Sequence, residues 1–351
     1  SSTRSSSSSG EGTPAGGHRT PKDLIPGRLM FPGDEKEYFF KAKDLAENMD
    51  EIGRGHFGTV YRMCHEESRR LMAVKKVRAC SMEARDQKRL LIELETVMNA
   101  HPCRHIIRFY GALFAEGDCW ICMELMDISL DRLYKKAIEQ GSPLSEAFVG
   151  HITTISALSF LKDNLKIMHR DVKPSNIVMN RDGAVKLVDF GVSGQLVNSV
   201  IASEGGCSPY MAPERLCGMG RKYDVRSDVW SLGITLVEIS TGVFPYSDWE
   251  STFVQMEEVV DGPAPLLTRA KLPSNFSNSF VRFVNSCLIK DREHRPKYKR
   301  LRERGFYERL YRLLIDDEDT LRNFGAFVSK IIDDGNADRD LTAVDVSSHS
   351  V

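Results

Sequence analysis

The sequence has no excess of charge of either sign and no long hydrophobic run. Lysine and arginine together number 48, against 49 aspartate and glutamate residues, so the formal net charge is −1. This balance argues against a protein that binds nucleic acid or an anionic membrane through its overall charge. No apolar stretch approaches the ~18 residues that span a bilayer. The first residues also lack the basic start and apolar core of a secretory signal.

Cysteine is scarce, with eight residues in a chain of 351. Disulfide frameworks stabilise small secreted domains, whereas a chain of this length buries a core of its own. We therefore expect reduced thiols and a cytoplasmic or nuclear location. At ~150 residues per domain, the length predicts two domains or one large bilobal unit.

Composition divides the chain into a leader, two lobes and a tail. Residues 1–44 begin with a serine-rich run and show no hydrophobic period, so we expect a disordered Ser/Gly-rich leader. From 45 to 126, short runs rich in β-branched and aromatic residues predict strands, with one helix over 85–98. From 127 to 305 the pattern is mostly helical. The sequence therefore predicts an α+β fold with a small β-rich N-lobe, a larger helical C-lobe and a cleft between them.

The first motif is G-x-G-x-x-G-x-V between two predicted strands. Glycines let the backbone approach phosphates and turn tightly. A dinucleotide fold would place such a motif between a strand and a helix, but here a strand follows, which favours a glycine flap over ATP. The motif consists of Ile52, Gly53, Arg54, Gly55, His56, Phe57, Gly58, Thr59 and Val60.

Lys75 ends the apolar run Met72-Ala73-Val74 on the next predicted strand. A lysine on a half-buried strand is costly without a partner, although a surface lysine extending to solvent is the common alternative. In a kinase this lysine contacts the α- and β-phosphates and pairs with a helix glutamate, for which Glu93 is the candidate.

Two later motifs supply the remaining chemistry of phosphoryl transfer. The run from His169 to Asn176 matches H-R-D-x-x-x-x-N. In this pattern Asp171 accepts the proton of the substrate hydroxyl, Lys173 neutralises the transferring phosphoryl group and Asn176 binds Mg²⁺. Asp189, in an Asp-Phe-Gly triplet, is the second expected Mg²⁺ ligand. Any one motif could arise by chance, but these occur in a fixed order together with Ala212-Pro213-Glu214.

Over residues 45–305 the chain resembles the eukaryotic protein kinases. The resemblance implies that Asp228 braces the catalytic loop and that Arg295 pairs with Glu214. It also implies an adenine pocket formed by Val60, Ala73 and Val178, by the backbone of Glu124–Met126, and by Met123 as the gatekeeper.

Within that family the chain looks most like the dual-specificity MAP kinase kinases, in particular the stress-activated branch that activates Jun N-terminal kinases. This resemblance implies Mg-ATP as the phosphate donor, a MAP kinase phosphorylated on Thr and Tyr as the substrate, and an upstream MAP kinase kinase kinase. The residues that carry it are Phe109–Phe114, Cys119–Asp127, Asp189–Val197, Tyr210–Arg215 and Tyr223–Gly233.

Ser199 and Ser203 match the paired activation sites of these kinases. Each phosphate would add nearly two negative charges and could pair with Arg170, which would order the segment. The sequence departs from the stress branch here, because Ser203 stands where Thr is usual and one residue fewer precedes Gly206-Cys207.

Two docking segments are expected from the same resemblance. Residues 306–333 contain Phe324, Phe327, Val328 and Ile331 at helical spacing, and we expect a C-terminal extension that docks upstream kinases. An acidic disordered tail is expected over 334–351. In the leader, Leu29-Met30-Phe31 after several basic residues is similar to a MAP-kinase docking peptide.

Two alternative functions remain at this point: a catalytically weak pseudokinase scaffold and a single-specificity Ser/Thr kinase. The presence of Lys75, Asp171, Asn176 and Asp189 argues against the first. Cys119-x-x-Cys122 could form a redox or metal pair, but it lies in an apolar strand without a second pair, which favours core packing.

Overall fold

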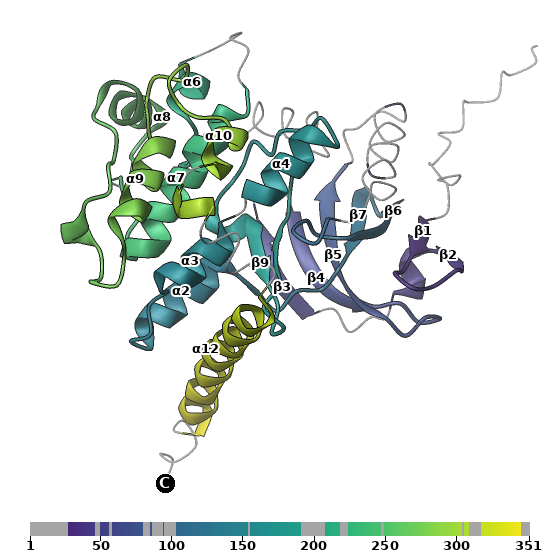
Figure 1. Ribbon diagram of the computed structural model, residues 1–351. Helices are drawn as coiled ribbons and strands as arrows, with labels where there is room; N and C mark the ends of the chain where they lie inside the picture. The colour runs from purple at the N-terminus through teal and green to yellow at the C-terminus, as the bar shows by residue number, and fades with distance from the viewer. Residues whose placement is uncertain are drawn as a thin grey trace, which may run out of the picture.

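The computed structural model describes residues 27–45, 50–55, 58–79, 85, 94, 103–153, 155–190, 208–217, 224–246, 249–303, 305–308 and 317–344. A strand-rich lobe lies beside a helical lobe, and helix α12 extends from the helical lobe (Figure 1). This arrangement confirms the predicted α+β bilobal fold.

One antiparallel sheet of seven strands forms the N-lobe, in the order β2-β1-β6-β7-β5-β4-β3. The strands that the sequence predicts between 45 and 126 are present, because β-branched and aromatic residues suit a pleated, half-buried surface. The strands are β1 (Gly27–Met30), β2 (Glu37–Phe40), β3 (Asp50–Gly55), β4 (Gly58–Cys64), β5 (Leu71–Arg78), β6 (Phe109–Ala115) and β7 (Asp118–Met123).

The C-lobe joins a small three-stranded sheet to a set of helices. Its strands are β8 (Ile128–Ser129), β9 (Ile177–Met179) and β10 (Val185–Leu187). The expected lobe boundary at 126–127 falls between β7 and β8. The helices are α2 (Leu130–Glu139), α3 (Glu146–Ile152), α4 (Ile155–Asp163), α6 (Pro213–Leu216), α7 (Arg226–Thr241), α8 (Thr252–Met256), α9 (Asn278–Cys287), α10 (Tyr298–Arg302) and α12 (Glu318–Val344).

Short helical turns complete the described chain. Among the residues expected to form the helix over 85–98, the two that are described, Arg85 and Leu94, are helical. The turns are η1 (Ala42–Asp44), η2 (Pro174–Asn176), η4 (Arg269–Lys271) and the π-helical η3 (Glu257–Asp261), which continues α8.

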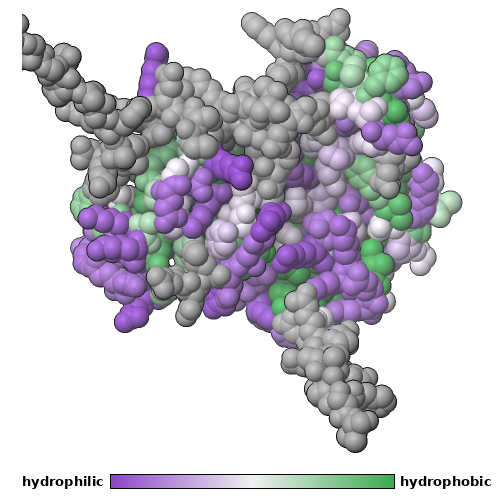
Figure 2. All heavy atoms as spheres, turned by 180° about the vertical axis from the view of Figure 1, so that it is seen from behind, coloured by the Kyte–Doolittle hydropathy of each residue, from purple (hydrophilic) through white to green (hydrophobic). Residues whose placement is uncertain are grey.

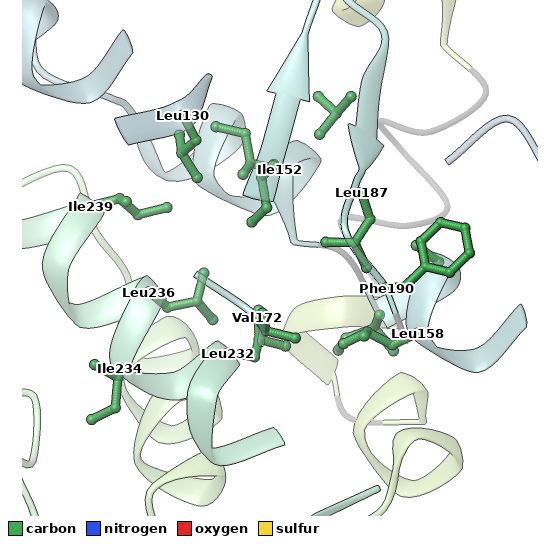
Figure 3. Close-up of a cluster of buried hydrophobic side chains, with 14 of the residues drawn as sticks. Leu130, Ile152, Leu158, Val172, Leu187, Phe190, Leu232, Ile234, Leu236 and Ile239 are labelled. Carbon is green, nitrogen blue, oxygen red and sulfur yellow. The ribbon is translucent and has the colours of Figure 1, made fainter. Parts of the chain in front are cut away.

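Helix α7 forms the centre of the C-lobe. Every residue from Ser227 to Ser240 is buried, and the helix ends at Gly242, whose φ of 78° suits glycine. In the cluster drawn in Figure 3, Leu232 and Leu236 of α7 pack in one buried group with Val172 of the catalytic loop. The loop that carries Asp171 is therefore anchored in the core by its own next residue.

The leader predicted over 1–44 is wrong for residues 27–44. β1 and β2 form a hairpin, and β1 pairs with β6, with Arg28 opposite Ala112 and Leu29 opposite Gly111. A Cβ on Gly27 would lie 2.4 Å from the Phe40 ring, so glycine permits this close approach. The hairpin joins the N-lobe because its apolar side chains cover the outer face of the sheet.

The docking peptide predicted at Leu29-Met30-Phe31 is also wrong. Leu29 is fully buried and Phe31 is 3% exposed, whereas Met30 between them is 44% exposed. The apolar-x-apolar triplet is thus the alternation of a strand whose two large side chains face the core. Neither buried side chain is available to a partner's groove.

Helix α12 packs on the C-lobe and continues beyond the expected boundary at 333. Phe324, Val328 and Ile331 are fully buried, in agreement with the helical spacing read from the sequence. Gly183 and Gly325 allow the close contact, because a Cβ on Gly183 would lie 2.1 Å from the Leu321 carbonyl oxygen. The disordered tail predicted from 334 is wrong up to 344, where the structure is helical. Residues 345–351 lie outside the described part.

The surface seen from behind is largely hydrophilic, with hydrophobic residues in separate areas (Figure 2). Among the described helices, none combines the length and the apolar character needed to cross a membrane.

Candidate active site

The glycine motif bridges β3 and β4. Gly55 pairs with Gly58, and Arg54 pairs with Thr59, so the two strands approach each other at the tip of the motif. A Cβ on Gly58 (φ 141°) would lie 2.0 Å from the Lys76 carbonyl oxygen, so a side chain there would push β4 away from β5. His56 and Phe57 lie outside the described residues.

Lys75 connects the two lobes. The residue is 7% exposed on β5, and its Nζ lies 2.6 Å from Asp189 Oδ2. This ion pair joins the N-lobe sheet to the segment that follows β10. Glu93, the partner expected from the sequence, lies outside the described residues.

The apolar residues expected around the adenine lie on strands of both lobes. Ala73 and Met123 are buried, and they lie opposite each other on β5 and β7. Val60 and Val178 are half-buried. Together these four side chains supply an apolar surface from both lobes, which suits a flat aromatic base.

The Glu124 backbone N–H is bonded within the protein. It donates to the Arg108 carbonyl oxygen at 2.9 Å. The Glu124 carboxylate accepts from Lys186 Nζ at 2.7 Å. Glu124 therefore links the segment after β7 to β10. The Glu124 carbonyl oxygen and the Met126 backbone remain the groups expected to contact the base.

Asp171 lies at the centre of a dense set of donors. Its Oδ2 accepts from Lys173 Nζ at 2.7 Å and from Asn176 Nδ2 at 3.0 Å, and its Oδ1 accepts from Ser208 Oγ at 3.2 Å. Burial acts to raise the pKa of Asp171, but the Lys173 ammonium and the neighbouring donors outweigh it, so the pKa lies below its usual value. The carboxylate is thus ionised at neutral pH.

Asp189 and Asn176 present the oxygens that a divalent cation prefers. Both hydrogen bonds of the Asn176 side chain, to the Asp171 carbonyl and carboxylate oxygens, use Nδ2, so the amide oxygen remains as a possible ligand. A carboxylate and an amide oxygen, with Lys75 beside them, suit Mg²⁺ bound together with phosphate. The residues present therefore fit Mg-ATP.

The catalytic loop has a strained backbone that Asp228 stabilises. Arg170 in this loop has φ 72°, a region that costs non-glycine residues about 1–3 kcal/mol. Asp189, which follows β10, has φ 59°. The Asp228 carboxylate accepts from the backbone N–H of His169 at 2.9 Å and of Arg170 at 2.7 Å. The predicted bracing role of Asp228 is confirmed.

Aromatic packing holds Phe190, next to Asp189, against β6 and the catalytic loop. Phe190 is buried, and its ring meets the rings of Phe109 and His169 at centroid distances of 5.6 Å and 6.4 Å. His169 Nε2 lies 2.8 Å from the Val188 carbonyl oxygen. The loop that contains His169 and the segment that contains Phe190 are therefore held together by these buried contacts.

The segment from Ser208 to Leu216 is anchored to the C-lobe through buried polar groups. Arg295 donates to both carboxylate oxygens of Glu214, at 2.8 and 3.1 Å, which confirms the predicted pair. Glu238 on α7 accepts from Tyr210 Oη at 2.6 Å and from Tyr134 Oη at 2.7 Å, and burial raises its pKa.

Comparison with known proteins agrees with this geometry. Residues 46–307 match the protein kinase domain family. MAP kinase kinase mkk-4 of Caenorhabditis elegans is 51% identical over 294 residues, which cover 83% of this chain and 80% of that protein. The dual specificity mitogen-activated protein kinase kinase sek-1 of the same organism is 45% identical over 284 residues, covering 80% of this chain and 83% of that protein.

A third relative is the dual specificity mitogen-activated protein kinase kinase hemipterous of Drosophila melanogaster. It is 41% identical over 283 residues, which cover 80% of this chain and 23% of that longer protein. The chain belongs to the MAP kinase kinase family of protein kinases. The sequence resemblance to this family is therefore confirmed, and the kinase is an ATP-dependent enzyme.

In the structure of this MAP kinase kinase, Lys75 pairs with Asp189, and Asn176 bonds Asp171. Ser199 and Ser203, which the sequence suggests as activation sites, lie outside the described residues. Sequence reasoning missed the contact of Ser208 with Asp171, and no motif in the sequence signalled it.

The two cysteines of Cys119-x-x-Cys122 are fully buried, one in each of the two hydrophobic clusters. Burial raises the pKa of Cys119 to about 12. Both cysteines pack in the core, as expected. A thiol that stays neutral is a poor redox group and a poor metal ligand.

Proposed function

We propose that this kinase phosphorylates Thr and Tyr in the activation segment of a stress-activated MAP kinase. The observation that carries the proposal is the pair of contacts between Lys75 and Asp189 and between Lys173 and Asp171, in a chain whose relatives bear the name MAP kinase kinase. Bound Mg-ATP supplies the phosphoryl group that is transferred. The residues of the chain orient the reactants and stabilise charge, which is the main source of catalysis in phosphoryl transfer.

Asp171 is the proposed proton acceptor. Two donors already occupy Oδ2, so Oδ1 is the oxygen that meets the acceptor hydroxyl. Lys173 lies beside the carboxylate and can neutralise charge that develops on the phosphoryl oxygens. Because Lys173 also keeps Asp171 ionised, one ammonium group serves both purposes.

Lys75, Asn176 and Asp189 are proposed to hold the phosphates and the metal ion, and Glu93 to orient Lys75. The glycine motif from Ile52 to Val60 would cover the phosphates with backbone N–H groups. Lys75 now contacts Asp189 directly, and binding of a metal by Asp189 would exchange this ion pair for contacts to phosphate.

The test is incubation of the purified kinase with several inactive MAP kinases and ATP, followed by mapping of the phosphorylated sites. Phosphate on both Thr and Tyr of one activation segment is the expected result. Phosphate on Ser or Thr alone would indicate a single-specificity kinase, and failure to bind or use Mg-ATP would indicate a pseudokinase scaffold.

Activation is proposed to require phosphorylation of Ser199 and Ser203 by an upstream kinase. Each phosphate would place acceptor oxygens near the basic catalytic loop and order the segment between Asp189 and Ser208. The double variant Ser199→Ala/Ser203→Ala should therefore show no activation after treatment with an upstream kinase, measured by the rate of MAP kinase phosphorylation.

The control for this experiment is Ser274→Ala, which removes an exposed hydroxyl from a distant loop of the C-lobe. That variant should be activated like the wild type. Normal activation of the double variant would assign the switch to other residues.

Partners and location follow from the same proposal. The MAP kinase kinase family implies a MAP kinase substrate and an upstream kinase, and we propose the Jun N-terminal kinase type as the substrate in the cytoplasm or nucleus. The docking role of 306–333 stays a prediction. Since the apolar side of α12 is buried against the C-lobe, docking would use its exposed side, which includes Arg322 and Lys330.

A further inference from the structure

The peptide that joins Arg170 to Asp171 is bonded at both ends. Its carbonyl oxygen, which belongs to Arg170, accepts from Arg215 Nη1 at 2.5 Å. Its N–H, which belongs to Asp171, donates to His169 Nδ1 at 3.2 Å. A peptide unit is planar, so bonds on both sides resist rotation of the plane about the line between its two Cα atoms. The backbone orientation at Asp171 is therefore set partly by a side chain from outside the catalytic loop.

This peptide needs support because Arg170 has a strained backbone. Its φ of 72° lies in the left-handed region, which is unfavourable for a residue with a side chain. Asp228 on α7 accepts from the Arg170 N–H at 2.7 Å, and Arg215 bonds the carbonyl side of the same residue. The strained residue before the proposed base is thus held by one side chain from α7 and one from α6. Only the first of these two was expected from the sequence.

The backbone of Arg215 is itself fixed in the C-lobe. Its N–H donates to the Ala212 carbonyl oxygen at 2.9 Å, within the turn that forms α6. The preceding residue, Glu214, accepts from Arg295 Nη1 and from Ser227 Oγ, each at 2.8 Å. Because Glu214 is anchored by these bonds, the Arg215 side chain extends to the catalytic loop from a fixed position.

We propose that Arg215 is a positioning residue, which orients Asp171 by holding the peptide between Arg170 and Asp171 in its strained conformation. The proposal rests on the role of Asp171 in the proposed function. Arg215 follows directly after Ala212-Pro213-Glu214, so it couples the segment that ends in α6 to the loop that carries the base. Without the guanidinium, the peptide would rotate to relieve its strain. Fewer encounters would then place the carboxylate correctly for the acceptor hydroxyl.

The proposal predicts a loss in kcat with little change in the KM for ATP, because the peptide that Arg215 holds leads to the base rather than to the nucleotide. A hydrogen bond from a charged donor has an energy that corresponds to about a tenfold rate effect. Arg215→Met keeps an unbranched side chain without a donor, and it should lower kcat by about this factor. Burial raises and Lys173 lowers the pKa of Asp171, and this variant changes neither, so the pH dependence of kcat should keep its position.

The decisive comparison is between Arg215→Met and Arg215→Lys. Lysine keeps a positively charged donor on a similar stem, although it lacks the planar guanidinium. Both variants are activated by the upstream kinase, the extent of their phosphorylation is measured, and kcat is determined on the inactive MAP kinase that the wild type phosphorylates. The lysine variant should have a kcat between those of the wild type and the methionine variant. A methionine variant with the wild-type kcat, or equal losses in both variants, would overturn the proposal.

Amide hydrogen exchange distinguishes a positioning role from a general loss of stability. Arg215→Met should increase exchange in the catalytic loop from His169 to Lys173, while exchange in the buried helix α7 stays as in the wild type. An increase spread over the whole C-lobe, together with a lower thermal midpoint, would show a purely structural role and overturn the proposal.

The matched control is Arg282→Met, which removes an exposed guanidinium that donates to Ser279 Oγ on α9. This variant should keep the wild-type kcat, and a loss as large as that of Arg215→Met would overturn the proposal. Asp171→Asn separates the proposal from the function on which it rests. Retained turnover in that variant would refute Asp171 as the base, whereas an inactive Asp171→Asn with an unaffected Arg215→Met would refute the positioning role alone.

Discussion

Replacing Asp171 with asparagine should abolish phosphoryl transfer while the protein remains folded. Asparagine has nearly the same size as aspartate but cannot accept the proton of the substrate hydroxyl. General base catalysis contributes about 10²- to 10⁴-fold to rates, so kcat should fall by at least this order. The rate of phosphate transfer from ATP to an inactive MAP kinase measures the effect.

The fold should tolerate this change because the neighbours of Asp171 have other support. Asn176 also bonds the Asp171 backbone carbonyl, and Asp228 holds the backbone of the preceding two residues. The thermal midpoint should therefore stay close to that of the wild type. Asp131→Asn, which weakens an ion pair to Lys135 on α2, is the matched control and should keep full activity. Wild-type turnover in Asp171→Asn would contradict the assignment of the base.

Replacing Arg295 with alanine should strongly destabilise the protein. The Arg295 side chain has no exposed surface, and it donates to Glu214, to the carbonyl oxygens of Ile289 and Arg226, and to that of Lys290. Its removal leaves the Glu214 carboxylate largely buried without its cationic partner, and breaking such a pair costs about 3–5 kcal/mol. Urea denaturation monitored by fluorescence measures the free energy of unfolding.

Two further variants show whether geometry or charge causes this loss. Arg295→Lys keeps the charge but loses the planar guanidinium that bonds both Glu214 oxygens. Its free energy of unfolding should therefore lie between those of the wild type and Arg295→Ala. Arg322→Ala removes an arginine whose ion pair with Asp319 is mostly exposed, and it should have no measurable effect. A loss below about 1 kcal/mol in Arg295→Ala would show that this buried network is not a main source of stability.

Sequence motifs predicted most residues of the candidate site, because the residues of each motif lie close together in the chain. The spacing of His169, Asp171 and Asn176 in one short loop requires only a few residues to bring the side chains together, and the structure shows those bonds. The strands from β4 to β7 were likewise visible, because each carries several apolar residues. Glu93, Ser199 and Ser203 stay predictions, as they lie outside the described residues.

Other features depended on pairing between distant segments. The triplet at Leu29 is too short to distinguish a strand from a docking peptide, and only its fit against β6 decides between them. Helix α12 continues past 333, although the acidic composition there suggested disorder. Its packing through Gly183 and Gly325 stabilises the helix at a point that local composition does not reveal.

The sequence by itself determined the family, the order of the catalytic motifs and the two-lobed architecture. Near-zero net charge and the absence of long hydrophobic runs argued against charge-driven nucleic-acid binding and against membrane spans. The basic residues expected to contact phosphate were identified from motif spacing. Tertiary structure decided which side chains meet: Lys75 with Asp189, and Ser208 with Asp171. The physical reason is that hydrogen bonds act over about 3 Å, and only the packed chain brings residues so far apart in sequence within that range.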